Sequence, residues 1–350
     1  MQRTALVTGS SGLVGSETSA YLDANGWTVH GVDNNMRADF FGTGGDTRST
    51  LERLRSTATR FTHHELDVRD RSAIAALVEE VRPDLIVHAA AQPSHDLAAN
   101  RVFDDFEVNA LGTLNLLEAA REWCAESPFA FMSTNKVYGE RPNELPLVEL
   151  DTRWDYANPE NQNGVDETMS IDATLHSLFG ASKASADLLV QEYGRYFGMP
   201  TVCFRGGCLT GAQHAGVPLH GFLAYRARAV RDGLPYQVFG HKAKQVRDNL
   251  HSLDVCRAIV AFAERPSAGA VYNLGGGRAN SVSMVEAIGR FQELFDRKLA
   301  WEYVDEPRRG DHICYISNLD RFRADYPSWS VSISLEAIFD VFVQTGAAVV

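Results

Sequence analysis

The side chains best suited to chemistry follow one apolar run in the middle of the chain. Residues 129–132 have the pattern of a buried strand, and Thr134, Asn135 and Lys136 come directly after it. A further amine, that of Lys183, follows along the chain. Hydroxyl, amide and amine groups at the end of a parallel strand are suited to bonding a polar substrate and to proton transfer. We therefore expect the active site at this strand end.

A phosphate-binding turn is indicated at the N-terminus. Residues 4–8 form an apolar, β-branched run typical of a buried parallel strand, and a helical pattern follows over residues 16–25. Glycines at three-residue spacing lie between them and allow a tight turn, close approach of a pyrophosphate, and close packing of helix on strand. The helix start adds free N–H groups and the positive end of the helix dipole. The residues expected at the phosphates are Gly9, Gly12, Leu13, Val14 and Gly15.

An acidic residue follows the second expected strand, residues 27–32. Asp33 lies 18 residues after Gly15, about where a carboxylate bonds the 2′-hydroxyl of an adenosine ribose. Because a carboxylate repels a 2′-phosphate, the sequence predicts NAD rather than NADP as cofactor. An ordinary βα turn would explain the glycines alone, but the flanking strand and helix and the acid favour a dinucleotide.

Other strand ends supply further candidates for the cofactor site. Asp67 either caps the next helix or meets the adenine amine, and capping is the simpler interpretation. The alanines at residues 89–91 let a cofactor lie across a strand end, or they simply pack closely. The further cofactor candidates are Asn34, Asp67, Val68, Ala89, Ala90, Ala91 and Asn109.

Bulk properties limit the class of protein. The 350 residues are 45% hydrophobic and 22% charged, and the formal net charge of −12 argues against a nucleic-acid partner. Five scattered cysteines without a C-x-x-C pair argue against a disulfide framework and a zinc site. His63 and His64 point to opposite faces of a strand, so they are unsuited to sharing a metal ion. With no signal-peptide pattern and no apolar stretch near ~20 residues, a cytoplasmic protein without a membrane span is expected.

The order of elements predicts the fold class. Strands and helices alternate through residues 1–205, which predicts an α/β fold with a Rossmann-type, doubly wound parallel sheet. Residues 206–350 mix short strands and helices, which predicts a smaller α+β substrate lobe with segments returning to the first domain. The polar, glycine-rich residues 34–50 are expected to form a long loop. The main strands are expected at residues 4–8, 27–32, 61–66, 85–91, 129–132 and 201–205, and the long helices at residues 101–125 and 176–197.

Two motifs carry a resemblance to a known family. Residues 133–139 read Ser-Thr-Asn-Lys-Val-Tyr-Gly, and residues 179–183 read Phe-Gly-Ala-Ser-Lys. With the glycine turn, they resemble the active site of the extended short-chain dehydrogenases/reductases (the NAD-dependent epimerase/dehydratase family), which act on nucleotide sugars. The resemblance implies that Thr134 bonds a sugar hydroxyl and that Lys183 holds the nicotinamide ribose. It also implies that a tyrosine four residues before Lys183 removes the hydroxyl proton.

Phe179 occupies the position of that tyrosine and has no ionisable proton. There are three interpretations: an engineered tyrosine-to-phenylalanine change that traps a bound substrate, a different base in the natural protein, or binding without turnover. The first is favoured, because Thr134, Lys183 and the glycine turn are all present and a decayed site would lose more than one hydroxyl. Tyr138 is the obvious substitute phenol, but the family more often uses this position structurally.

The residues after the threonine distinguish two reactions. Nucleotide-sugar 4,6-dehydratases have Asp-Glu there, an acid and a base for loss of water, whereas this chain has Asn135 and Lys136. With Lys-Gln-Val-Arg-Asp at 244–248 and Phe-Arg-Gly-Gly-Cys-Leu-Thr-Gly at 204–211, they resemble the CDP-paratose 2-epimerase (CDP-tyvelose epimerase) group, nearly end to end. The resemblance implies an epimerase with tightly held NAD that acts at C2 of a CDP-hexose. A dehydratase or dehydrogenase of the same fold and a catalytically silent NAD-binding protein remain alternatives.

The second lobe is expected to hold the nucleotide sugar, because guanidinium groups bind phosphate in a bidentate way. Arg247 and Arg309 are the candidates for the diphosphate. The expected substrate contacts are Gln92, Asn135, Arg205, Gly206, His220, Gln245, Arg247, Arg309 and Asp311.

Two further expectations concern a loop and the assembly. His214 and His220 flank a glycine-containing loop that either faces the sugar or is merely polar. Residues 101–125 and 176–197 resemble the helix pair through which family members form a homodimer. Either helix could equally pack within one subunit.

Overall fold

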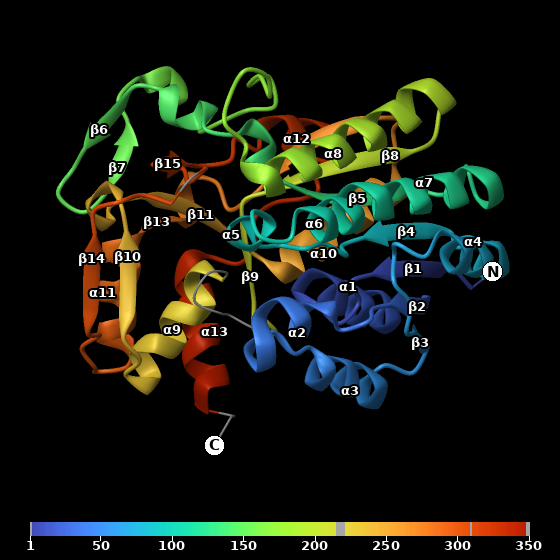
Figure 1. Cartoon of the computed structure of the whole chain (residues 1–350), viewed down its shortest axis with the longest axis horizontal. Helices are drawn as coiled ribbons and strands as arrows, with labels where there is room; N and C mark the ends of the chain where they lie inside the picture. The colour runs from blue at the N-terminus through green and yellow to red at the C-terminus, as the bar shows by residue number, and fades with distance from the viewer. Residues whose placement is uncertain (1, 215–220, 309, 348–350) are drawn as a thin grey trace.

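A parallel sheet forms the centre of the molecule (Figure 1). The computed structural model describes residues 2–214, 221–308 and 310–347. Within them, a seven-stranded sheet has the order β12-β8-β5-β4-β1-β2-β3, and each neighbouring pair is parallel. Its strands are β1 (Thr4–Thr8), β2 (Thr28–Val32), β3 (Phe61–His64), β4 (Leu85–His88), β5 (Phe129–Thr134), β8 (Thr201–Gly206) and β12 (Ala270–Leu274). The predicted α/β, doubly wound sheet is confirmed.

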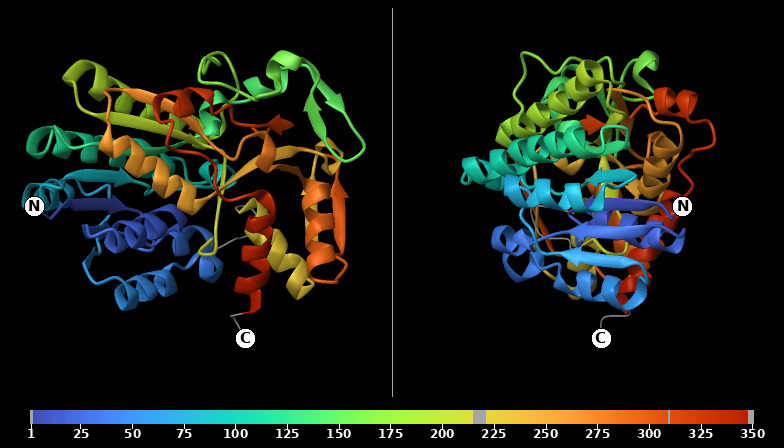
Figure 2. Two further views of the ribbon diagram at one scale, coloured as in Figure 1. Left: turned by 180° about the vertical axis from the view of Figure 1, so that it is seen from behind. Right: turned by 90° about the vertical axis from the view of Figure 1, so that its right-hand side faces the viewer.

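Helices cover both faces of this sheet (Figures 1 and 2). Along β1, Ala5 and Val7 face one apolar cluster and Leu6 faces the other, as the alternation of a strand requires. Helices α1, α10 and α12 contribute to the first cluster, and α4, α7 and α8 to the second. The helices around the sheet are α1 (Leu13–Ala24), α2 (Met36–Phe41), α3 (Arg48–Thr57), α4 (Arg71–Val81), α5 (His95–Ala98), α6 (Val102–Phe106), α7 (Gly112–Trp123), α8 (Ser177–Phe197), α10 (Ser252–Glu264) and α12 (Asp320–Asp325).

Two local predictions are wrong. Residues 34–50 are not a long loop, because they contain α2 and the start of α3. Asp67 does not cap the helix that follows it. The N-cap of α4 is Asp70, whose carboxylate accepts the N–H of Ala73 at 3.0 Å, while Asp67 bonds Arg69.

The helix expected over residues 101–125 consists of three consecutive pieces. A π-helical turn, Glu107–Leu111, joins α6 to α7. Such a turn inserts an extra residue into the helical ladder and is frequent near functional sites. Asn109 lies in this turn and is buried.

The second lobe lies beside the carboxyl ends of the central strands (Figure 1). Its own apolar cluster is formed largely by α9, α11 and α13. The chain returns from this lobe to the central sheet, where α10 packs against α1 and β12 pairs with β8. The lobe and its flanking hairpin contain β6 (Leu147–Glu149), β7 (Trp154–Tyr156), β9 (Cys208–Thr210), β10 (Tyr236–Phe239), β11 (Val246–His251), β13 (Ser281–Ser283), β14 (Trp301–Val304), β15 (Cys314–Tyr315), α9 (Phe222–Asp232), α11 (Met284–Leu294) and α13 (Leu335–Ala347). In the described part of the chain, no helix is both long and apolar enough to cross a bilayer.

Candidate functional site

A cavity of about 450 Å³ runs along the carboxyl ends of the central strands and under the second lobe. It includes the point where β1 has β2 on one side and β4 on the other. Connections leave a doubly wound sheet in opposite directions at such a point, which opens a crevice for a ligand. The predicted site residues that line it are Gly9, Gly12, Leu13, Val14, Gly15, Asp33, Asn34, Asp67, Val68, Ala89, Ala90, Ala91, Thr134, Asn135, Lys136, Phe179, Lys183, Gly206, Arg247 and Asp311.

The glycine turn is a cradle with no room for side chains. Gly9 has φ +67°, and a Cβ there would lie 2.7 Å from the backbone nitrogen of Ala90. A Cβ on Gly15 would lie 2.0 Å from the carbonyl oxygen of Gly9. Helix α1 begins after Gly12 with no side-chain cap, so its first N–H groups face the cavity end of the turn. This arrangement fits a pyrophosphate.

Asp33 ties the glycine turn to the segment after β2. Its Oδ2 accepts the N–H of Ser11 at 2.9 Å, and its Oδ1 accepts the N–H of Asn35 at 2.8 Å. These bonds fix the carboxylate at the cavity wall. Each oxygen keeps a further lone pair, so the group can still accept a ribose hydroxyl.

Substitution of Gly15 tests the cradle. We expect Gly15→Ala to lower the free energy of unfolding by about 1–3 kcal/mol, because the added methyl meets backbone atoms that cannot move aside. The variant should also lose bound NAD, read from the absorbance of the protein as purified. Gly289→Ala is the matched control: Gly289 lies within α11 with no atom within 4 Å of its Cβ position, so alanine should stabilise the helix slightly. Equal stability and NAD content in the two variants would contradict the cradle.

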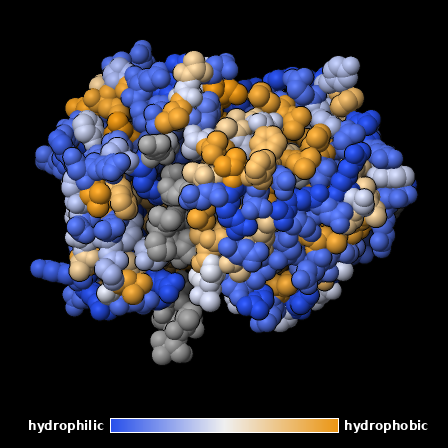
Figure 3. Space-filling view, in the orientation of Figure 1, coloured by the Kyte–Doolittle hydropathy of each residue, from blue (hydrophilic) through white to orange (hydrophobic). Residues whose placement is uncertain are grey.

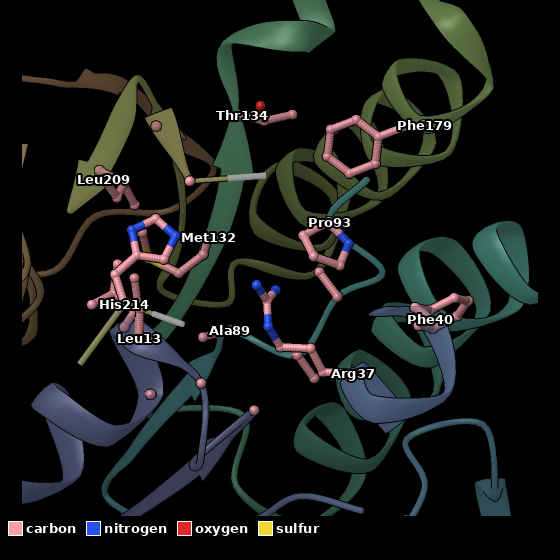
Figure 4. A pocket seen from close by; sticks show the side chains of 18 of the residues that line it. Leu13, Arg37, Phe40, Ala89, Pro93, Met132, Thr134, Phe179, Leu209 and His214 are labelled. Carbon is pink, nitrogen blue, oxygen red and sulfur yellow. The ribbon is translucent and has the colours of Figure 1, made fainter. Parts of the chain in front are cut away.

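The opposite end of the cavity lies between β5 and the start of α8. The ring of Phe179, 7% exposed, faces Thr134 across the cavity (Figure 4). The Thr134 hydroxyl accepts the N–H of Lys136 at 3.2 Å, which holds it at the strand end. Lys183 is buried and donates from Nζ to the carbonyl oxygen of Met132 at 2.7 Å. Burial lowers the pKa of Lys183 to about 8, although the charge of Asp187 acts against this shift.

Several charged side chains line the cavity beside the second lobe. Lys136 Nζ donates to the carbonyl oxygen of Gly310 at 2.8 Å and lies 3.5 Å from the Asp311 carboxylate. Arg247 donates to the same carboxylate at 2.5 Å. Arg308, which lies three residues before Asp311 in the sequence, also lines the cavity. Burial lowers the pKa of Lys136 to about 8, against the opposing charge of Asp311. Three cationic side chains that line the same cavity suit a phosphate-bearing ligand.

The match to a family model decides the family. The model described as the NAD dependent epimerase/dehydratase family matches residues 5–275. The chain belongs to this family. Its cofactor is NAD, in agreement with the prediction from Asp33 and with the fit of the glycine cradle.

Similar proteins cover nearly the whole chain. The CDP-paratose 2-epimerase of Salmonella typhi is 29% identical over 94% of this chain and 95% of that protein. A dTDP-glucose 4,6-dehydratase of Escherichia coli is 28% identical over 95% of this chain and 85% of that protein. The solved UDP-glucose 4-epimerase of Thermus thermophilus, in complex with NAD, has a TM-score of 0.79 and 26% identity over 99% of this chain and 100% of that one.

Four residues expected at the ligand lie outside the cavity lining. Arg205 is buried and pairs with Asp187, with Nη2 at 2.8 Å from Oδ1. Asn109 Oδ1 accepts the backbone N–H of Gln92 at 3.0 Å, so these two residues support the wall from behind. Gln245 is buried and donates to a backbone carbonyl. His220 and Arg309 lie outside the described residues.

Tyr138 is enclosed in a polar network and does not line the cavity. Its hydroxyl donates to Asn273 at 2.8 Å and accepts from Arg205 at 3.2 Å. Burial raises its pKa to about 12. A fully buried phenol with two partners is a structural group, so it does not substitute for a tyrosine at position 179.

His214, whose loop was expected either to face the sugar or to be merely polar, lines the cavity beside Leu13 and Leu209 (Figure 4). Burial and the nearby charge of Arg37 lower its pKa to about 3, so its imidazole is neutral. Several further lining residues were not found from the sequence. Except for Cys208, which lies in the stretch over residues 204–211, they carry no motif, and the tertiary fold brings them to the cavity: Arg37, Phe40, Pro93, Cys208, Tyr225, Arg226, Tyr236, Met284 and Arg308.

Proposed function

We propose that the protein is a nucleotide-sugar epimerase that inverts C2 of a CDP-hexose by transient oxidation and reduction. The observation that carries this proposal is the continuity of the cavity. The cofactor cradle, the Thr134 and Lys183 side chains, and the cationic Lys136 and Arg247 all line this one cavity. A sugar between the cofactor and Thr134 would therefore place its diphosphate at the cationic end. The similarity to CDP-paratose 2-epimerase supports cytosine as the nucleobase and C2 as the carbon that is inverted.

The chain's own residues bind and orient the sugar. The Thr134 hydroxyl bonds the hydroxyl that is oxidised, and Lys183 anchors the nicotinamide ribose. The glycine cradle and Lys183 would hold NAD, which would supply a hydride acceptor and donor for the sugar carbon. Inversion requires that the flat keto-sugar turn before the hydride returns to its opposite face. Net redox is zero because the hydride returns to the sugar. The proton of the sugar hydroxyl must likewise pass to a base and come back.

The residues beside Thr134 support epimerisation over dehydration. Elimination of water needs an acid and a base at the sugar, and Asn135 has an amide that does neither. Lys136 is an amine held by Gly310 and Asp311 on the phosphate side of the cavity. A cation at this position favours binding of the diphosphate over proton transfer at the sugar ring.

Position 179 limits turnover in this form. Phe179 places an apolar ring where the family motif supplies a phenol, and Tyr138 is enclosed elsewhere. We propose that the substrate binds next to Phe179 and reacts slowly for want of this base.

An isotope experiment tests the reaction. The protein and its Phe179→Tyr variant are incubated with CDP-, UDP- and dTDP-hexoses in ordinary and deuterated water, and products are followed by NMR. Inversion at C2 of the CDP-hexose without solvent deuterium is the expected result. Deuterium at the inverted carbon would replace the mechanism with proton abstraction. A stable keto product would indicate a dehydratase or dehydrogenase, and no reaction in either form would indicate a silent binding protein.

We also propose that the protein forms a homodimer through α6 and α8. Large apolar side chains are exposed on these helices, with Phe103 83% and Leu188 47% exposed. Figure 3 shows apolar side chains gathered on the face that includes them. Phe103→Lys should convert a dimer to a monomer, measured by sedimentation equilibrium. A monomeric parent protein would refute this assembly.

A further inference from the structure

Arg226 is a buried charge that needs a partner. It lies on α9, is 1% exposed and lines the cavity. No acidic residue in the described part of the chain forms an ion pair with it, and its hydrogen bonds go to a carbonyl, a hydroxyl and a thioether. A guanidinium keeps its charge in proteins, and burial without compensation is costly. A bound ligand is therefore the natural source of the missing acceptors.

The guanidinium is held firmly with donors to spare. Nη1 donates to the carbonyl of Phe222 at 2.7 Å, and Nη2 donates to the Tyr236 hydroxyl at 2.7 Å. Its carbon lies 4.3 Å from the centre of the Phe222 ring and 5.2 Å from that of Tyr236. Nε–H is buried without a partner, and a second Nη2 contact, at 2.6 Å, goes to the sulfur of Met284, a weak acceptor. Two adjacent acceptors on a ligand could take these donors.

The shape of the substrate indicates which part of it reaches Arg226. A nucleotide sugar is linear, with the diphosphate between sugar and nucleoside. If the sugar lies at Thr134 and the diphosphate at Arg247, the nucleoside lies beyond Arg247. The strand pairing connects Arg247 to the surroundings of Arg226. Strand β11, which carries Arg247, pairs with β13, and β13 leads directly into Met284. Tyr236 and Met284 contact Arg226, and with Tyr225 they line the cavity, where aromatic side chains suit a flat base.

We propose that Arg226 recognises the edge of the nucleobase and selects cytosine. This inference rests on the proposed function and names the residue behind its base preference. Cytosine presents two adjacent acceptors, N3 and O2, to a guanidinium. Uracil and thymine present an N–H at position 3, which faces the donors of Arg226 and leaves them unmatched. A bidentate contact of this kind discriminates against a wrong base by about tenfold or more.

Binding of nucleotides without turnover tests the inference. Calorimetric titration of the NAD-loaded protein with CDP, UDP and inorganic pyrophosphate gives the base preference and the phosphate contribution separately. The parent protein should bind CDP ~10-fold or more tightly than UDP. Arg226→Met should remove this preference by weakening CDP while leaving pyrophosphate unchanged. Arg226→Lys keeps the charge but lacks the planar fork, so it should also lose the preference.

Matched controls make each outcome decisive. Arg228→Met changes an exposed arginine on the same helix, which forms an ion pair with Asp232 at 3.7 Å, and should keep the preference. Thermal unfolding and NAD content confirm that each variant is folded. Equal losses for CDP, UDP and pyrophosphate in Arg226→Met would overturn base reading in favour of a phosphate contact, and no loss would make Arg226 structural. A folded parent protein that binds neither nucleotide would refute the proposed function itself.

Discussion

Phe179→Tyr should raise the rate of sugar inversion by about 10²–10⁴-fold, the usual contribution of a positioned acid–base group. The ring at position 179 faces Thr134 across the cavity, so the added hydroxyl would enter the space assigned to the sugar hydroxyl (Figure 4). Lys183 lies one helical turn further along α8. Its ammonium would lower the pKa of the new phenol from about 10 toward neutrality. The measurement is the rate of C2 inversion of a CDP-hexose with saturating substrate.

Two further variants separate chemistry from packing. Phe179→Leu also changes the packing at this position but supplies no phenol, so it should give no gain. Phe179→Tyr combined with Lys183→Met should keep the phenol but lose most of the gain, because the phenol is no longer activated. A Phe179→Tyr protein that holds NAD yet inverts no nucleotide sugar would contradict the assigned role of this position.

Asp187→Asn should lower the free energy of unfolding by about 3–5 kcal/mol, because it breaks a buried ion pair by removing one charge. The Asp187 side chain is fully buried, and Arg205 donates to it from Nη2 at 2.8 Å and from Nε at 3.2 Å. Ser133 and Gln191 also donate to it, at 2.5 Å and 2.6 Å. The change would leave the Arg205 guanidinium buried without a counter-charge. Urea unfolding followed by circular dichroism gives the loss.

Asp232→Asn is the surface counterpart of this substitution. Asp232 pairs with Arg231 at 2.7 Å, but both side chains are about one-third exposed, so the cost should stay below about 1 kcal/mol. Addition of Arg205→Leu to Asp187→Asn should recover part of the lost stability, since the orphaned charge is removed. Similar losses for Asp187→Asn and Asp232→Asn would show that the buried pair does not hold α8 to β8.

The pattern of the sequence predicted most of the central sheet, because strands such as β4, β5 and β8 are buried on both faces. Such strands read as uninterrupted apolar runs, and the turn after β1 has little conformational choice. The segment over residues 34–50 was misread because glycines suggested a loop. In the structure, a Cβ on Gly45 would lie 2.6 Å from the carbonyl oxygen of Arg37, so this glycine serves close packing between short helices. That contact depends on tertiary structure and leaves no periodic signal.

The residues of the candidate site also divide into those that a local motif reveals and those that only the tertiary structure reveals. Thr134 and Lys183 were found because their spacing belongs to a motif. Arg205 was assigned to the substrate because nothing local shows that Asp187 neutralises it. Arg226 was missed for the opposite reason: it is one of several arginines on a helix that reads as charged and exposed, and only the fold encloses it.

The return of the chain to complete the sheet affects how the protein is made. Strand β8 ends at Gly206, but its outer neighbour, β12, begins only at Ala270. At usual elongation rates the ribosome needs roughly 3–13 s to make the intervening segment. Throughout that interval the edge of β8 has unpaired backbone groups that another nascent chain can bind. Slower initiation, which spaces ribosomes along the message, should therefore raise the soluble yield more than slower elongation, which lengthens the exposure.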